Sequence, residues 1–70
     1  MTYVYVIEKA NDGSYSAYVP DLPGGTTSGE TVDEVKRNIK DAVNLYIDSR
    51  REHKEPVPAP SSMVDVIEAA

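Results

Sequence analysis

The stretch "VPDLPGGTTSGETVDEVKRNI", residues Val19 to Ile39, contains the chain's change from strand to helix. Pro20 and Pro23 lack the backbone N–H that a ladder hydrogen bond needs, so strand pairing must be interrupted between them. Asp21 has a short carboxylate that often bonds its own downstream backbone in turns. We therefore predict a structural corner whose residues are Pro20, Asp21, Pro23 and Gly24.

A short strand and a helix are predicted after this corner. Thr26 to Ser28 are small β-compatible residues and indicate a third strand. Thr31, with Glu34 three positions later, has the spacing of a capping box. Apolar residues then recur at three- and four-residue intervals, which predicts an amphipathic helix from Val32 to Arg51. Its apolar stripe is expected to comprise Val35, Ile39, Ala42, Val43, Tyr46 and Ile47.

Two strands are predicted before the corner. Residues 2–9 are β-branched and aromatic, and residues 15–19 alternate apolar and polar side chains. Asp12 and Gly13 lie between these segments, and a glycine here supplies the positive φ of a tight hairpin turn. The sequence therefore predicts an antiparallel hairpin at the start of the chain.

A proline-rich connector and a last strand are predicted after the helix. Residues 55–62 contain three prolines, which cannot continue a helix. Residues 63–67, "MVDVI", indicate a final strand. The whole chain, residues 1–70, is then one α+β domain of order β-β-β-α-β, an antiparallel sheet with one helix packed on one face.

One helix covers one face of a sheet, so the other face is a candidate interface. Tyr15, Ala17 and Val19 share a face that is expected to meet the helix, which places Tyr18 on the opposite face. The exposed set from the first strand is either Val4 and Val6 or Tyr3 and Tyr5. The candidate residues for binding a partner or a second copy are Tyr18, Val4, Val6 and Leu22.

Composition narrows the possible functions. The chain has no cysteine, and its net charge is −5, which argues against binding to a phosphate backbone and so against DNA binding. No apolar run approaches the roughly 20 residues of a membrane span, and no signal peptide is evident. We expect a cytoplasmic protein that needs no cofactor or metal. We also expect a homo-oligomer, a dimer or a tetramer, because small domains without disulfides or bound metal ions commonly need a partner for stability.

The run from Tyr15 to Ile47, with its P-D-L-P-G corner and acidic helix start, resembles the N-terminal domain of HicB-type antitoxins. The terminal prolines and the last predicted strand also fit this family. The resemblance implies the β-β-β-α-β fold, related to double-stranded-RNA-binding domains. It also implies an inhibitor, not an enzyme, that neutralises a HicA-like RNA-cleaving toxin by covering its active site.

The sequence departs from the family pattern in two respects. Gly25 stands where the family often has cysteine, and no DNA-binding domain follows the last predicted strand, so operator binding is not expected. Two alternatives remain open. One is an orphan self-oligomerising HicB-like domain with another regulatory partner. The other is a metal-dependent nuclease, with carboxylates drawn from Glu8, Asp12, Asp21 and Asp65.

Overall fold

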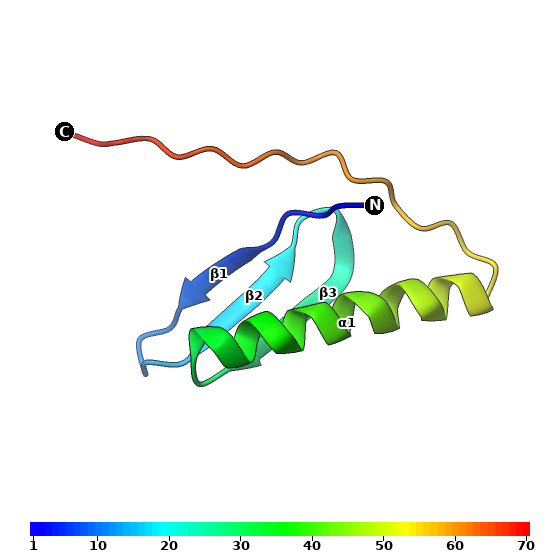
Figure 1. The fold of residues 1–70 in the computed structure, drawn as a ribbon, viewed down its shortest axis with the longest axis horizontal. Coiled ribbons are helices and arrows are strands. Elements are labelled where there is room, and N and C mark those ends of the chain that lie inside the picture. The colour runs from blue at the N-terminus through cyan, green and yellow to red at the C-terminus, as the bar shows by residue number, and fades with distance from the viewer.

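The computed structural model describes all 70 residues and shows a three-stranded antiparallel sheet packed on a single helix (Figure 1). The strands are β1 (Val6–Lys9), β2 (Tyr15–Val19) and β3 (Leu22–Gly29), arranged in the order β1-β2-β3. The helix, α1, spans Val32–Glu52. This arrangement confirms the predicted α+β class and the helix on one face of the sheet.

The hairpin between β1 and β2 forms as predicted. Gly13 has a φ of 89°, a conformation that side chains disfavour. The Oδ1 atom of Asp12 accepts hydrogen bonds from the Ser14 hydroxyl at 2.6 Å and the Ser14 backbone N–H at 2.9 Å. These bonds, the hydroxyl bond first, lower the pKa of Asp12. Backbone hydrogen bonds from Ala10 N–H to the Ser14 carbonyl at 2.8 Å and from Gly13 N–H to the Ala10 carbonyl at 3.0 Å also close the turn.

Strand β1 is shorter than the predicted 2–9 segment. Val6 pairs with Tyr18 and Lys9 with Tyr15. Continuing this antiparallel register would place Val4 opposite Pro20, but β2 ends one residue earlier, at Val19. The chain turns away there, so residues 1–4 run past the end of β2 with no strand to pair with.

The corner is tighter than predicted, and β3 is longer. Strand β3 begins at Leu22, not at Thr26, so only Pro20 and Asp21 lie between the strands. Val19 pairs with Leu22 while Tyr18 pairs with Thr26. Pro23 and Gly24 therefore belong to an irregular stretch of β3, which bulges out of the ladder. Because β3 is an edge strand, the missing N–H of a proline is tolerated in it.

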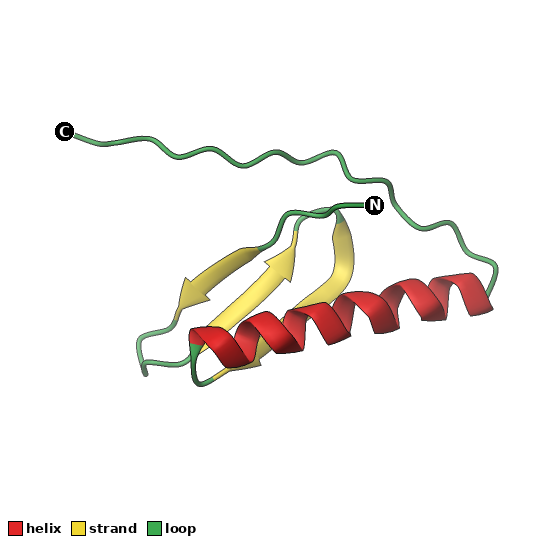
Figure 2. Cartoon of the chain, in the orientation of Figure 1, coloured by secondary structure: helices red, strands yellow, loops and turns green.

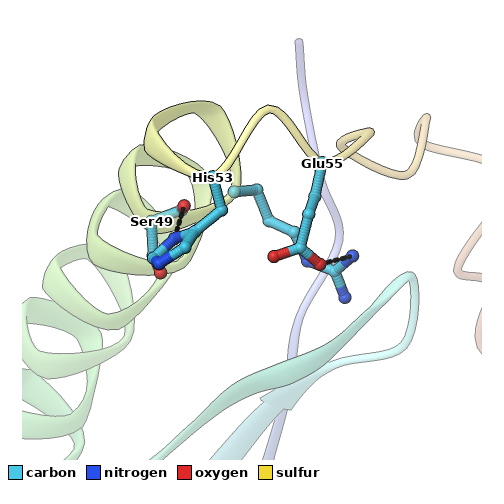
Figure 3. A network of polar contacts seen from close by, with 4 residues as sticks. Ser49, His53 and Glu55 are labelled. Carbon is cyan, nitrogen blue, oxygen red and sulfur yellow. Dashed lines mark hydrogen bonds and ion pairs between the residues drawn. The ribbon is translucent and has the colours of Figure 1, made fainter.

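Helix α1 has the predicted start and nearly the predicted end. The Thr31 hydroxyl accepts a hydrogen bond from the Glu34 backbone N–H at 3.1 Å, which is the N-cap contact. At the other end, His53 Nδ1 lies 2.8 Å from the Ser49 carbonyl oxygen, and Arg50 forms an ion pair with Glu55 at 3.3 Å (Figure 3). These contacts occupy polar groups of the last turn where the chain leaves the helix.

The core lies between α1 and the β2–β3 half of the sheet. The helix packs on β2 and β3 and leaves β1 largely uncovered (Figure 2). Val35 and Ile39 are its buried residues, as the apolar stripe predicted, whereas Val43 and Tyr46 are half-buried. The fully buried hydrophobic cluster comprises Ala17, Val19, Leu22, Val35 and Ile39.

The predicted last strand is absent. Residues 56–70, called the tail below, run without helix or strand across the start of the sheet and then away from it (Figure 2). No strand ladder includes residues 63–67. A strand requires a neighbouring backbone to pair with, and the tail lies beside none. The sheet of one chain therefore has three strands instead of four.

Candidate protein-binding surface

The face of the sheet that points away from α1 carries a small apolar patch. Val6 and Tyr18 are partners in the β1–β2 register, so their side chains lie on the same face. Ala17 and Val19 point to the opposite face and are buried in the core. Val4 shares the parity of Val6, although it lies before β1 begins. We call Val4, Val6 and Tyr18 the back-face patch.

Polar residues surround the back-face patch. Along the strands, Glu8 pairs with Ser16, Ser16 pairs with Ser28, and Tyr18 pairs with Thr26. These partners share the face of Tyr18, whose side chain is 39% exposed. An aromatic ring with a polar rim is a typical composition for the centre of a protein interface. The patch can therefore contact a partner but is limited in area.

Leu22 is not part of this surface. The sequence predicts Leu22 as an interface residue, but its side chain is completely buried in the core. It pairs with Val19 directly after the two-residue corner, which turns it inward against the helix. Its predicted interface role is corrected accordingly, because the folded chain offers a partner no surface at this position.

Asp21 bonds residues far along the chain instead of its own downstream backbone. Its Oδ2 atom accepts hydrogen bonds from the backbone N–H groups of Ser61 and Ser62, both at 3.0 Å. Its Oδ1 atom accepts from the two hydroxyls, at 3.0 and 2.8 Å. These bonds, led by the backbone N–H of Ser62, lower the pKa of Asp21 to about 2. The corner is thus the anchor for the tail.

The two glycines of the corner motif allow close packing. A Cβ atom on Gly24 would lie 2.6 Å and 2.7 Å from two ring carbons of Tyr46. One on Gly25, the position where the resemblance suggested cysteine, would lie 3.3 Å from Leu22. The glycine at position 24 is therefore required for the ring of Tyr46 to pack against the β3 backbone.

A groove opens where α1 leaves the start of the sheet uncovered. It has a volume of about 310 Å³. We call it the N-terminal groove, and its main lining residues are Tyr3, Tyr5, Val19, Ile39, Lys36 and Lys40. The floor is apolar and the two lysines come from the helix. The sequence does not predict this groove, because the groove results from the position of the helix, which packs over β2 and β3 and not over β1.

The carboxylates considered for a nuclease do not come together. No three His, Asp or Glu side chains lie close enough to hold a metal ion. Asp12 is in the hairpin turn, Asp21 binds the tail, and the single His53 caps the helix. The helix is also too polar to cross a membrane. The four carboxylates therefore do not form the metal site that a two-metal nuclease requires.

Two known proteins are similar to this chain in sequence over most of its length. Over 58 residues the chain is 45% identical to a UPF0150 protein of Thermoplasma acidophilum, a match that covers 83% of this chain and 84% of that one. It is 35% identical over 63 residues to the antitoxin HicB of Escherichia coli K12, covering 90% of this chain and 46% of the relative. The chain thus spans about half the length of that antitoxin.

A solved structure shares the fold. The N-terminal domain of the Burkholderia pseudomallei antitoxin HicB superposes with a TM-score of 0.80 at 28% sequence identity, over 90% of this chain and 74% of that one. Residues 3–70 match the family described as the HicB-like antitoxin of bacterial toxin–antitoxin systems. With sequence, fold and relatives in agreement, the chain belongs to the HicB-like antitoxin family.

Proposed function

We propose that this domain neutralises a HicA-type RNA-cleaving toxin in the cytoplasm by binding over the toxin's active site. The observation that carries the proposal is the family membership of nearly the whole chain, residues 3–70. Inhibition by coverage requires a contact surface and no chemistry from the inhibitor. The back-face patch, with Tyr18 at its centre, is the surface that we assign to the toxin.

Charge supports this partner. The chain has 7 basic and 12 acidic residues, whereas a ribonuclease must attract RNA phosphates and so presents a basic surface. Opposite potentials steer two proteins together and raise their association rate. An acidic domain is therefore suited to reach the RNA-binding surface of a small basic toxin.

Tyr18 is expected to contribute most to toxin affinity. Tyrosine is enriched among the few interface residues that carry most binding energy, because it buries a large ring and keeps a polar tip. Val4 and Val6 extend the apolar contact along the same face. The neighbouring Ser16 and Thr26 can then form hydrogen bonds at the rim of the interface.

The proposal is tested by co-expressing the chain with any HicA-type ribonuclease that is encoded beside its gene. We expect the chain to co-purify with the ribonuclease and to restore growth that the ribonuclease alone inhibits. Tyr18→Asp should abolish both effects. Leu45→Asp is the matched control, since Leu45 is an exposed apolar residue on the helix. Absence of a complex, or full rescue by Tyr18→Asp, would reject this assignment.

We also propose that the domain acts as a homo-oligomer, a dimer or a tetramer. Apolar surface remains exposed on the back face and on the tail, and such surface usually marks an interface. The second candidate function, an orphan self-assembling domain with another regulatory partner, is supported by the same surface. It predicts a stable oligomer that binds no neighbouring ribonuclease.

A further inference from the structure

The tail presents an unpaired segment with the composition of a strand. After Ser62 the chain leaves the protein surface, and Met63, Val64, Val66 and Ile67 are 94%, 63%, 90% and 94% exposed. These four apolar residues surround Asp65 in an extended chain. So much exposed apolar side chain in five consecutive residues is unfavourable in water and is the composition of a strand that pairs with another strand.

The sheet has a matching free edge at β1. Strand β1 pairs only with β2, so its outer side offers unpaired backbone N–H and C=O groups. The helix does not cover β1, and the N-terminal groove lies between residues 1–5 and α1. A strand added at this edge would therefore form hydrogen bonds with the unpaired backbone groups of β1 and place its own side chains over the groove.

We propose that residues 63–67 of one copy add to the β1 edge of a second copy as a fourth strand, and that the second copy does the same in return. Main-chain hydrogen bonds of the added strand would provide affinity, and its alternate side chains would provide specificity. Each chain has one strand to give and one edge to receive it. In two copies related by a twofold axis, each tail strand therefore pairs with the β1 edge of the other copy, and no tail strand or β1 edge is left unpaired.

The second copy is the occupant because the chain's own tail is held off its own edge. The four hydrogen bonds from Ser61 and Ser62 to Asp21 fix the tail at the β2–β3 corner. The Tyr3 hydroxyl donates a further bond to the Pro58 carbonyl. Beyond these contacts the tail runs outward (Figure 1), and no backbone hydrogen bond joins residues 63–67 to β1.

Side-chain alternation along the tail matches the groove. Val64, Val66 and Glu68 share one side of an extended strand. The two valines would contact the apolar floor of the groove, and Glu68 would lie towards Lys36 and Lys40 on the helix side of the groove. Met63 and Ile67 project from the other side, where they would extend the apolar surface of Val4 and Val6. The valine side of the donated strand is therefore buried against the groove, while Met63, Asp65 and Ile67 stay on the back face.

The oligomeric state of the full chain tests the proposal. By light scattering and sedimentation, we expect a dimer for the wild type. Val66→Asp should weaken the dimer at least about tenfold, since a charge would enter an apolar groove. Val66 is 90% exposed in the single chain, so this change leaves the monomer folded, which circular dichroism checks. Leu45→Asp, on the helix, should leave the dimer unchanged.

A second measurement distinguishes exchange between copies from folding back within one copy. Isotope-labelled and unlabelled chains are mixed, and contacts between the methyl groups of the labelled tail and the Tyr3 or Tyr5 rings of unlabelled chains are recorded by NMR. Contacts between differently labelled chains support strand exchange. A monomeric wild type, a dimer that tolerates Val66→Asp or fails with Leu45→Asp, or contacts confined to one chain would overturn it. None of these outcomes depends on toxin binding.

Discussion

The Asp21 carboxylate accepts hydrogen bonds from both the backbone N–H of Ser62, at 3.0 Å, and its hydroxyl, at 2.8 Å, although 41 residues separate the two in the sequence. Ser61 makes the same two kinds of contact. A single carboxylate at the two-residue corner between β2 and β3 thus fixes where the tail leaves the molecule. The direction of residues 63–70, and with it the proposed strand exchange, depends on this contact.

We predict that Asp21→Asn releases the tail while the sheet and helix remain folded. An amide has only one acceptor oxygen, so it cannot receive all four hydrogen bonds. Amide hydrogen exchange of Ser61 and Ser62 should become much faster, whereas the exchange of Val35 in the helix should not change. Asp65→Asn is the control, because Asp65 bonds only the backbone of Val66. Unchanged protection of Ser61 and Ser62 would contradict the anchoring role.

Acid should release the tail only at unusually low pH. The ordinary pKa of this carboxyl is 3.8, and the hydrogen bonds, the Ser62 backbone bond first, lower the pKa of Asp21 to about 2 in the folded chain. Because the folded pKa is the lower one, the stabilisation is complete above pH 3.8 and is lost as pH falls through about 2. NMR titration of the Asp21 carboxyl and of the Ser62 amide should give a common midpoint near the lowered value. A midpoint at the ordinary value would mean that the bonds do not form in solution.

Local sequence signals predicted the hairpin, the N-cap and the buried stripe of α1 well. Gly13 and Thr31 act through neighbours within four residues, and the burial of Val35 follows from its spacing along the helix, so all three can be inferred from local sequence. The remote contacts could not be inferred. Asp21 could equally bond its own downstream backbone, and nothing in the sequence singles out Ser61 and Ser62 as its partners.

Strand pairing was harder to predict than strand propensity. Residues 2–5 and 63–67 have the β-branched composition of strands, yet neither segment forms one in the single chain. Composition reports whether a residue suits a pleated surface, whereas a strand also requires a partner backbone in register. The predicted interface role of Leu22 was wrong for a related reason, since the direction of its side chain depends on the length of the corner.

We predict that Tyr46→Phe leaves the domain as stable as before or stabilises it. The Tyr46 hydroxyl is buried with no hydrogen-bond partner, and leaving such a group unsatisfied costs about 1 kcal/mol or more. Phenylalanine keeps the ring that packs on Gly24 and lies 5.1 Å from the Arg50 guanidinium carbon. Chemical denaturation should show a free energy of unfolding equal to or higher than that of the wild type. Tyr5→Phe, at an exposed ring, is the neutral control, and a clear loss of stability in Tyr46→Phe would reveal a partner for the hydroxyl.

Gly24→Ala should destabilise the domain by about 1–3 kcal/mol, the usual cost of forcing an extra methyl into a packed site. The new Cβ would lie 2.6 Å from a ring carbon of Tyr46, so the ring must move away from β3. Chemical denaturation measures the loss. In a Tyr46→Ala background the same substitution should cost much less, because the obstructing ring is gone. Equal costs in both backgrounds would place the effect in the backbone of the bulge instead.

A pair of apolar-to-acid changes separates the two sides of the sheet. Ile39→Asp should unfold the domain, since Ile39 lies in the core and an unpaired charge there costs about 4 kcal/mol or more. Tyr18→Asp should change stability by less than about 1 kcal/mol, because the ring on the back face is well exposed and the new carboxylate remains in water.

Thermal unfolding, followed by circular dichroism, measures the stability of both variants. Only Tyr18→Asp is then titrated with the HicA-type ribonuclease to measure toxin binding. A folded Tyr18→Asp that no longer binds the ribonuclease fits an interface role for Tyr18. If Tyr18→Asp melts the isolated chain as severely as Ile39→Asp does, the ring supports the fold, and loss of toxin binding in that variant would carry no information about the interface. The stability measurement must therefore precede the binding measurement.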